Sequence, residues 1–174
     1  MKYLIASDLH GETFAYQLLL ERTEEEKPDK IVLLGDLDKN GKVPAINAIL
    51  DQLKIPIFTV EGNCDSEEKL KMFHVENKGT NMEECVEERC IFYTHGHIYG
   101  IHNLPPMLEK GDIFLYGHWH EGNLGEVDGI FYGNAGSLAR PRNGSKASYI
   151  ILSDKEMTLK DGNNGEVIKK QTIC

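Results

Sequence analysis

The 174-residue chain lacks several features that would assign a protein to a broad class at once. No apolar run approaches the roughly 20 residues that a transmembrane helix needs. Positive charge is not in excess, because 28 acidic residues against 19 Lys and Arg give a formal net charge of −9. Cysteine is scarce, and the four residues Cys64, Cys85, Cys90 and Cys174 form neither a CxxC pair nor zinc-finger spacing.

These absences restrict the partners, the localisation and the disulfide content expected of the protein. The negative charge disfavours a general binder of nucleic acid or of anionic membranes, because such a protein needs a basic face. It leaves room for a small anionic substrate, since bound dications can invert the local field. The N-terminus enters a strand directly at Met1–Ile5 without a signal peptide, so we expect a cytoplasmic protein. In that reducing compartment we expect no disulfide.

The first half of the chain alternates between strand and helix patterns. Length and composition predict one domain over residues 1–174. Ser66 is a candidate N-cap for a short helix through Phe73. The apolar patterns predict strands over 3–7, 30–34 and 56–60, and helices over 13–22, with Phe14, Leu18 and Leu19 on one face, and over 43–53. This alternation indicates right-handed βαβ units and a parallel sheet, hence an α/β fold.

The second half changes character. A hairpin is expected from Cys85–Val86 and Cys90–Thr94, followed by a short helix over Asn103–Lys110 and a strand over Asp112–Tyr116. Asp128 and Gly129 form a good hairpin turn. Short β segments then follow over 127–130, 148–152, 157–159 and 167–172.

Polar side chains of metal-ligand types follow five of the predicted strands. Asp36 comes directly after the buried run Ile31–Leu34 and Gly35, and could alone be a helix N-cap. Four other segments have the same placement: Asp8-Leu9-His10, Gly62-Asn63, His95-Gly96-His97 and His118-Trp119-His120. Residues i and i+2 of an extended chain point the same way, so each pair can converge on one point. A mixed carboxylate, imidazole and amide set suits Mn²⁺, Fe or Zn²⁺ rather than a thiolate site.

Together these segments resemble a known family signature. Ser7-Asp8-Leu9-His10-Gly11, Leu34-Gly35-Asp36, Gly62-Asn63-Cys64-Asp65, Thr94-His95-Gly96-His97 and Tyr116-Gly117-His118-Trp119-His120 are similar to the motifs of the calcineurin-like metallophosphoesterases. Within them the chain resembles the small YfcE-like phosphodiesterases. The resemblance implies a four-layer α-β-β-α sandwich with mixed sheets.

The resemblance also implies a dinuclear centre. Asp8, His10 and His120 would hold one dication; Asn63, His95 and His118 would hold a second; Asp36 would bridge them. Mn is the expected metal, with Fe, Zn, Ni and Mg as alternatives. A phosphodiester would be hydrolysed by attack of a metal-bridging hydroxide, because metals bring the pKa of a bound water toward about 7.

Residues beside the ligands are candidates for further roles. His97 could orient the phosphate or protonate the leaving group, or serve as a hydrogen-bonding neighbour of the ligands. Asn63, Cys64, Asp65 and His97 are the candidates for catalytic roles. Most of the superfamily has histidine, paired with an acid, where this chain has Cys64 and Asp65. Cysteine is a poorer proton donor to an alkoxide, so the usual acid catalyst is in question, and Cys64 could instead be structural.

Three further segments have less specific expectations. Arg140 and Arg142 could bring cations near a substrate phosphate, or lie in a solvated loop. Asn134-Ala135-Gly136-Ser137 is expected to be structural, and Trp119 to point away from the metals.

Two other functions share these residues: a phosphomonoesterase with the same metal site, and a non-catalytic interaction scaffold. The intact set of seven ligand positions disfavours the scaffold. The expected partner is a small phosphodiester, with no membrane or strong nucleic-acid binding, and a homodimer or homotetramer is possible within such a family.

Overall fold

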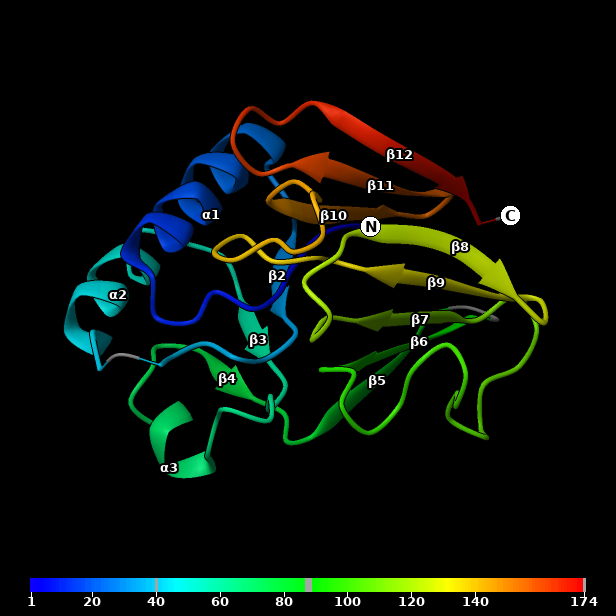
Figure 1. Cartoon of the computed structure of the whole chain (residues 1–174), viewed down its shortest axis with the longest axis horizontal. Coiled ribbons are helices and arrows are strands. Elements are labelled where there is room, and N and C mark those ends of the chain that lie inside the picture. The colour runs from blue at the N-terminus through cyan, green and yellow to red at the C-terminus, as the bar shows by residue number, and fades with distance from the viewer. Residues whose placement is uncertain (40, 87–88, 174) are drawn as a thin grey trace.

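The computed structural model describes residues 1–39, 41–86 and 89–173, and it is an α/β fold with two stacked mixed sheets (Figure 1). The seven-stranded sheet has the order β12-β11-β10-β1-β2-β3-β4, and the five-stranded sheet the order β5-β6-β7-β9-β8. The strands of the first sheet are β1 Lys2–Ala6, β2 Lys30–Leu33, β3 Ile57–Thr59, β4 Glu76–Asn77, β10 Ser148–Ser153, β11 Glu156–Asp161 and β12 Val167–Thr172. Those of the second are β5 Asn81–Val86, β6 Arg89–Thr94, β7 Ile113–Tyr116, β8 Asn123–Val127 and β9 Ile130–Asn134. Parallel pairing joins β1 through β4 with a helix in each connection, which confirms the βαβ units expected in the first half of the chain. Strands β6, β7 and β9 are also parallel, but no helix connects them in the described segment 89–134.

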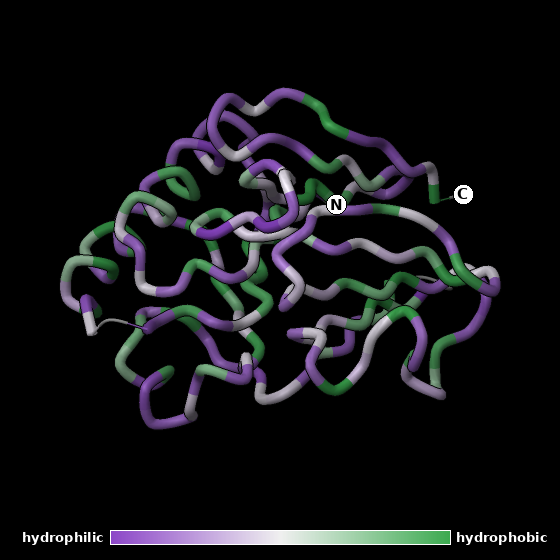
Figure 2. Tube along the Cα trace, in the orientation of Figure 1, coloured by the Kyte–Doolittle hydropathy of each residue, from purple (hydrophilic) through white to green (hydrophobic). Residues whose placement is uncertain are grey.

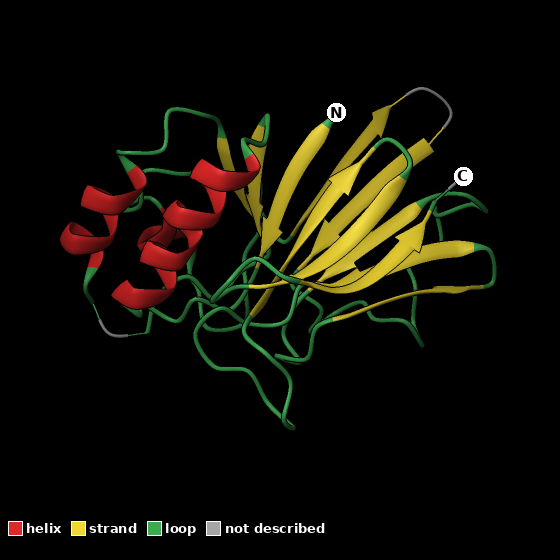
Figure 3. Ribbon diagram, turned by 90° about the horizontal axis from the view of Figure 1, so that it is seen from above, coloured by secondary structure: helices red, strands yellow, loops and turns green. Residues whose placement is uncertain are grey.

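The helices α1 (Thr13–Glu26), α2 (Val43–Leu50) and α3 (Glu67–Leu70) all lie on one side of the sheets (Figure 3). The first extends beyond the expected end and stops at Lys27, which takes left-handed backbone with φ +50°. The Ser66 side chain accepts a hydrogen bond from the Lys69 amide, as its N-cap role predicts. Phe14 is 53% exposed, so the buried face of α1 does not include it. Among the described residues, no helix is long and apolar enough to cross a membrane.

Side chains of the central strands alternate between two separate cores. Leu4 and Ala6 of β1 face the helices, whereas Ile5 faces the space between the sheets. In β7, Ile113 and Leu115 face that space too, while their neighbours along the strand face outward. This period of two explains why the strands carry continuous apolar runs. Figure 2 shows the apolar residues concentrated in these central strands, whereas β12 is largely hydrophilic.

The expected helix over Asn103–Lys110 is wrong. The segment 97–112 forms turns and one isolated bridge between Gly100 and Asn103. Pro105 and Pro106 remove two backbone donors in succession, which disfavours a helix at that point. The segment instead covers the outer face of the five-stranded sheet, packing Tyr99, Ile101, Leu104 and Leu108 against Phe92, Phe114, Tyr116 and Ile130. The layer over this sheet is therefore irregular where a helical layer was expected.

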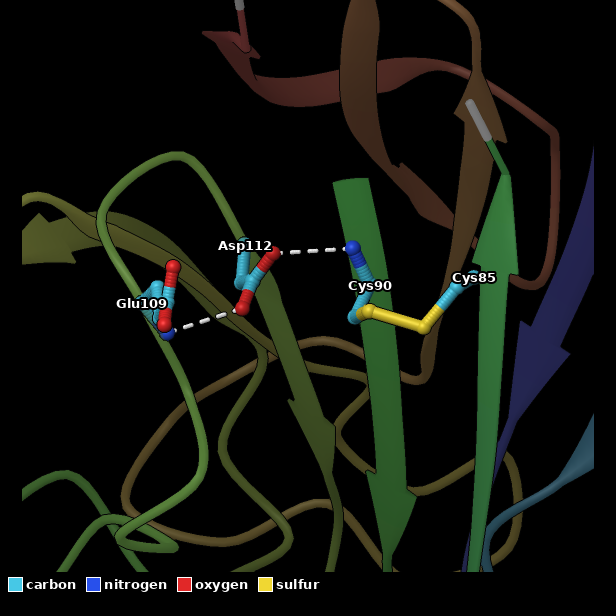
Figure 4. Close-up of a disulfide and its surroundings, with 4 residues drawn as sticks. All are labelled: Cys85, Cys90, Glu109 and Asp112. Carbon is cyan, nitrogen blue, oxygen red and sulfur yellow. Dashed lines mark hydrogen bonds between the residues drawn. A yellow bond between two sulfur atoms is a disulfide. The ribbon is translucent and has the colours of Figure 1, made fainter. Parts of the chain in front are cut away.

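The expectation of no disulfide is also contradicted. Cys85 and Cys90 face each other across the β5–β6 pair and are bonded, with Cα atoms 4.0 Å apart (Figure 4). Asp112 holds the same region, because its carboxylate accepts the amides of Cys90 and Glu109 at 2.8 Å each. The register of β5 on β6 places these two cysteines opposite each other. Cysteine spacing along the chain does not predict that register. Cys64 is free and exposed, and Cys174 lies outside the described residues.

Candidate metal centre

The loops that follow β1, β2, β3, β6 and β7 meet at one edge of the two stacked sheets. The Asp8 amide donates to the Gly35 carbonyl at 3.1 Å, which ties the first two loops together. The His118 amide donates to Asp8 Oδ2 at 2.9 Å, which ties a loop of one sheet to a loop of the other. All seven side chains expected to be metal ligands are thereby brought into one region.

A first group consists of Asp8, His10 and His120, all buried. His120 Nε2 lies 3.1 Å and His10 Nε2 lies 3.6 Å from the same carboxylate oxygen, Asp8 Oδ1. The two Nε2 atoms are 3.2 Å apart. Three potential ligand atoms therefore surround one small space.

A second group lies beside it and is centred on His95. Its Nε2 atom is 3.0 Å from Asn63 Oδ1 and 3.2 Å from His118 Nδ1. Asp36 lies between the groups, with Oδ2 at 3.4 Å from His95 Nε2 and at 3.8 Å from His10 Nε2. Asp8 Oδ1 also comes within 4.0 Å of His95 Nε2, so the two groups are contiguous.

Hydrogen bonds around the imidazoles turn their lone pairs toward this space. His95 Nδ1 donates to the Leu34 carbonyl at 2.6 Å, and His120 Nδ1 donates to the Arg140 carbonyl at 2.7 Å. With Nδ1 carrying the proton in each ring, Nε2 is left as a lone-pair donor aimed at the carboxylates. Asp8 Oδ1 is buried and has no hydrogen-bond partner. A buried carboxylate oxygen without a partner, facing several imidazole nitrogens, fits metal coordination, and the buried Asp/His clusters are consistent with a site for two metal ions.

Glycines let the backbone loops approach this closely. A Cβ placed on Gly62 would lie 2.1 Å from Asp36 Oδ1, and one placed on Gly117 would lie 1.9 Å from Ser7 Oγ. Only a residue without a side chain fits either position.

Five of the seven expected ligands have left-handed backbone, with φ between +48° and +68°: Asp8, His10, Asp36, His118 and His120. Non-glycine residues in this region are uncommon and cluster at functional sites.

The carboxylates and imidazoles perturb one another strongly. Burial alone would raise the pKa of Asp36, but the neighbouring His95 and the amide of Cys64 outweigh it and hold that pKa well below its usual range. Burial lowers the pKa of His10 and of His118. For His95 the effect of burial is overcome by Asp36 and Asp8, so its pKa is raised. Such mutual perturbation is typical of a functional centre.

Asp65 and Ser7 hold the ligand loops in place. Both carboxylate oxygens of Asp65 accept backbone amides: Oδ2 from Asp36 at 2.7 Å and Gly62 at 2.9 Å, and Oδ1 from Leu37 at 3.1 Å. Burial and the charge of Asp36 raise the pKa of Asp65. Ser7 Oγ donates to Asp8 Oδ2 at 2.6 Å. Ser7 belongs to the motif Ser7-Asp8-Leu9-His10-Gly11, but its contact with the Asp8 carboxylate was not predicted from sequence.

Cys64 and His97 lie at the opening of the site. The Cys64 amide donates to Asp36 Oδ1 at 2.9 Å, and burial together with Asp36 raises the pKa of its thiol. His97 is exposed, with its ring centroid 5.4 Å from that of His95. Burial and the nearby His95 lower the pKa of His97.

The arginines are placed differently from each other. Arg140 forms an ion pair with Glu12 at 2.8 Å, so its guanidinium is already engaged. Arg142 is exposed. The backbone carbonyl of Arg140 contacts His120, and its charge contributes to the lowered pKa of His10.

The segment 134–137 has structural contacts. Asn134 Nδ2 donates to the Gly117 carbonyl at 3.0 Å, and Ser137 Oγ donates to the Asp8 carbonyl at 2.7 Å. Both side chains tie this turn to the loops that carry the expected ligands.

Comparison with known proteins agrees with this geometry. Residues 1–157 match the family model described as the calcineurin-like phosphoesterase superfamily domain. Phosphodiesterase YfcE of Escherichia coli K12 is 31% identical over 182 aligned residues, covering 99% of this chain and 98% of that protein.

Solved structures extend the comparison. The structure of YfcE, a phosphoesterase from E. coli, has a TM-score of 0.87 at 29% identity and full coverage of both chains. The zinc complex of Vps29 from Entamoeba histolytica, at 18% identity, TM-score 0.67 and full coverage of both chains, shares the fold. The chain is thus an enzyme of the phosphoesterase type, and it belongs to the calcineurin-like phosphoesterase superfamily.

Proposed function

We propose that this protein is a dinuclear, metal-dependent phosphodiesterase. The observation that carries the proposal is the position of Asp36 Oδ2, within 3.8 Å of His10 Nε2 on one side and 3.4 Å of His95 Nε2 on the other. We assign Asp8, His10 and His120 to one ion, Asn63, His95 and His118 to the other, and Asp36 to both. Mn²⁺ is the ion we expect to activate most, since the donor set is mixed N and O, with Fe, Zn, Ni and Mg as alternatives.

Bound dications would polarise the phosphoryl oxygens and lower the pKa of a coordinated water toward about 7. Residues of the chain position the ligands of these ions. Asp65 fixes the loops that present Asp36 and Asn63 by accepting their backbone amides, which favours a positioning role for this residue. Ser7 orients the Asp8 carboxylate, so that its other oxygen remains free to bind a cation.

Proton delivery to the leaving group falls to residues at the opening. His97 is exposed, and it follows His95 by two residues, with the two ring centroids 5.4 Å apart. Burial and His95 lower its pKa, so at a given pH a smaller fraction of it carries a proton to donate than of an ordinary histidine. The raised pKa of Cys64 keeps this thiol protonated. We therefore assign His97 and Cys64 to contact with the ester, and we expect activated leaving groups to react best.

A phosphodiester suits this centre better than a phosphomonoester. A monoester carries a second negative charge, which an arginine at the centre would stabilise. The guanidinium of Arg140 is paired with Glu12, and Arg142 is an exposed residue. The similarity to phosphodiesterase YfcE over the whole chain points the same way.

The test is reconstitution of chelator-treated protein with Mn²⁺, Fe²⁺, Zn²⁺, Ni²⁺ or Mg²⁺. Hydrolysis of bis(p-nitrophenyl) phosphate is then compared with that of p-nitrophenyl phosphate. We expect two ions per chain, the highest rate with Mn²⁺, and a kcat/KM for the diester at least tenfold above that for the monoester. Full activity with less than one ion per chain would refute the dinuclear centre. A faster monoester reaction would make the protein a phosphomonoesterase.

A further inference from the structure

A cleft of about 480 Å³ opens beside the proposed metal centre. Its walls come from two segments, 96–103 and 119–123, and from Tyr116 and Asn134 beneath them. The first segment belongs to the irregular layer over the five-stranded sheet, and the second follows β7. The size is in the range of pockets that hold small organic molecules.

Trp119 lies next to the centre and also lines the cleft. This residue lies between two proposed ligands in sequence, and its ring meets the ring of His118 edge-on, with centroids 5.5 Å apart. Trp119 also lines the cleft, where its side chain is 59% exposed. Gly96, between His95 and His97 in sequence, lines the same cleft. A substituent on a phosphorus atom held at the centre therefore reaches the cleft by passing over the Trp119 ring.

The lining combines aromatic and aliphatic side chains with polar ones. Trp119, Tyr99 and Ile98 supply apolar surface, and Ile98 is 50% exposed. Asn103 and Asn123 also line the cleft. Asn103 Nδ2 donates to the Ile98 carbonyl at 3.2 Å and Asn123 Oδ1 accepts the Leu124 amide at 2.9 Å, so Asn103 Oδ1 and Asn123 Nδ2 are the amide groups offered to a ligand. Exposed Trp and Ile in one concave site indicate a ligand that stacks on or packs against them.

Charge restricts the ligand further. None of the lining residues, all of which the structure describes, is Lys or Arg. One carboxylate, that of Glu121, faces the cleft and disfavours a second anionic group there. Lys169 reaches the rim only through Asn123, whose Oδ1 accepts its Nζ at 2.9 Å.

We infer that this cleft binds one ester substituent of the substrate, an uncharged aromatic ring of the nucleobase kind, while the phosphate lies at the metal centre. The inference rests on the proposed function for the position of the phosphate. The ring stacks on Trp119, its edge meets the asparagines, and a substituent with its own phosphate is rejected.

Trp119 is the only tryptophan in the chain, so its fluorescence reports on the cleft directly. Protein saturated with Mn²⁺ is titrated with the methyl ester of adenosine 5′-phosphate, with dimethyl phosphate and with the methyl ester of phosphocholine, at an excitation wavelength absorbed by Trp alone. We expect saturable quenching by the adenosine ester and none by the two ligands without a ring. No saturable change with the adenosine ester, or stronger binding of the choline ester, overturns the inference.

A cleft-filling variant provides the second measurement. Gly100 lies in the lining, and a Cβ placed there meets no atom within 4 Å, so Gly100→Phe is expected to fold and to fill the cleft. Met107→Phe is the matched control, because Met107 is 52% exposed in the same layer but does not line the cleft. For bis(p-nitrophenyl) phosphate, we expect Gly100→Phe to raise KM at least tenfold with kcat within about threefold, and Met107→Phe to change neither.

An unchanged KM in folded Gly100→Phe, with the melting temperature of the wild type, overturns the inference. The two proposals fail in distinguishable ways. If no ester is hydrolysed with any metal, the proposed function fails, whereas the fluorescence titration still reports whether the ring binds in the cleft.

Discussion

The two sheets supply different chemistry to the same centre. The loops of the seven-stranded sheet bring oxygen donors, Asp8, Asp36 and Asn63, together with one imidazole, His10. The loops of the five-stranded sheet bring imidazoles alone: His95, His118 and His120. Neither sheet carries a complete mixed ligand set for two ions, so the centre exists only where the sheets pack together.

The difference also concerns charge. Two buried carboxylates from one sheet would repel each other, and burial of an unpaired charge costs several kcal/mol. The imidazoles of the other sheet, and the cations that we propose between them, offset this cost. Variants on the oxygen side should therefore have larger effects than variants on the nitrogen side.

The largest effect is expected for Asp36→Asn. This change removes the charge shared by both proposed ions, so we expect kcat to fall more than 100-fold, a loss of about 2.7 kcal/mol in transition-state stabilisation. Metal content, measured by mass spectrometry, should fall below one ion per chain. Asp51→Asn is the control, because Asp51 is an exposed carboxylate on the helix side of the molecule, paired with His74. Retention of more than a tenth of the wild-type rate would show that Asp36 does not serve both ions.

On the nitrogen side, His118→Ala should affect one ion only. His118 lies 3.2 Å from His95 and belongs to a single group. We expect the metal content to fall from two ions to one and kcat to fall by about 10- to 100-fold, in line with the loss of one ligand. His74→Ala is the control, since His74 is exposed and far from the strand ends that carry the centre. Loss of both ions in His118→Ala would show that His118 does not serve one ion alone, contrary to the proposed assignment of ligands.

Gly62→Ala tests the close approach of loops within the seven-stranded sheet. The added methyl would collide with Asp36 Oδ1 and with the Asp36 amide at 2.4 Å, so Asp36 must move. We expect activity to fall at least tenfold and stability by about 1 to 3 kcal/mol, as for other overpacked positions. Gly144→Ala, where a Cβ meets open space but φ is +74°, should lose about 1 to 2 kcal/mol of stability and keep activity within twofold. Activity and thermal unfolding of both variants decide the matter, and a fully active Gly62→Ala would show that the loops can separate without loss of function.

The smallest effect is expected at the opposite end of the five-stranded sheet. Reduction of the Cys85–Cys90 bond opens a loop of only five residues' separation, so about 2 kcal/mol of stability should be lost at most. His95 follows the other end of β6, so kcat should change less than twofold. The measurement compares melting temperature and turnover with and without a thiol reductant, with Cys85→Ser as the genetic equivalent. A large fall in kcat would show that the disulfide at one end of β6 affects the metal centre at the other end.

The first half of the chain, and the gathering of the proposed ligands in one region, could be predicted from sequence because both depend on local patterns. A buried strand followed at once by Gly35 and Asp36 is visible in a few residues. The disulfide and the irregular layer could not be predicted, since both depend on contacts between distant segments. The register of β5 on β6 brings Cys85 to Cys90, and the outer face of the sheet selects the apolar residues of 97–112.

The contacts by which Ser7 and Asp65 support the proposed ligands could not be predicted from sequence either. Ser7 and Asp8 are neighbours in sequence, but the hydrogen bond between their side chains and the close approach of Gly117 to Ser7 become apparent only in the structure. Asp65 had been expected to take part in catalysis as a neighbour of Cys64, and its three backbone hydrogen bonds become apparent only in three dimensions.

The left-handed backbone at five of the proposed ligands has an evolutionary consequence. Such conformations cost of order 1 kcal/mol or more at each non-glycine residue, so the positions needed for activity are the ones that the fold itself disfavours. Glycine at Asp8 or Asp36 would relieve both the backbone and the buried charge. In a lineage no longer selected for hydrolysis, these positions should therefore drift first, and their loss should leave a more heat-stable protein with the same two sheets.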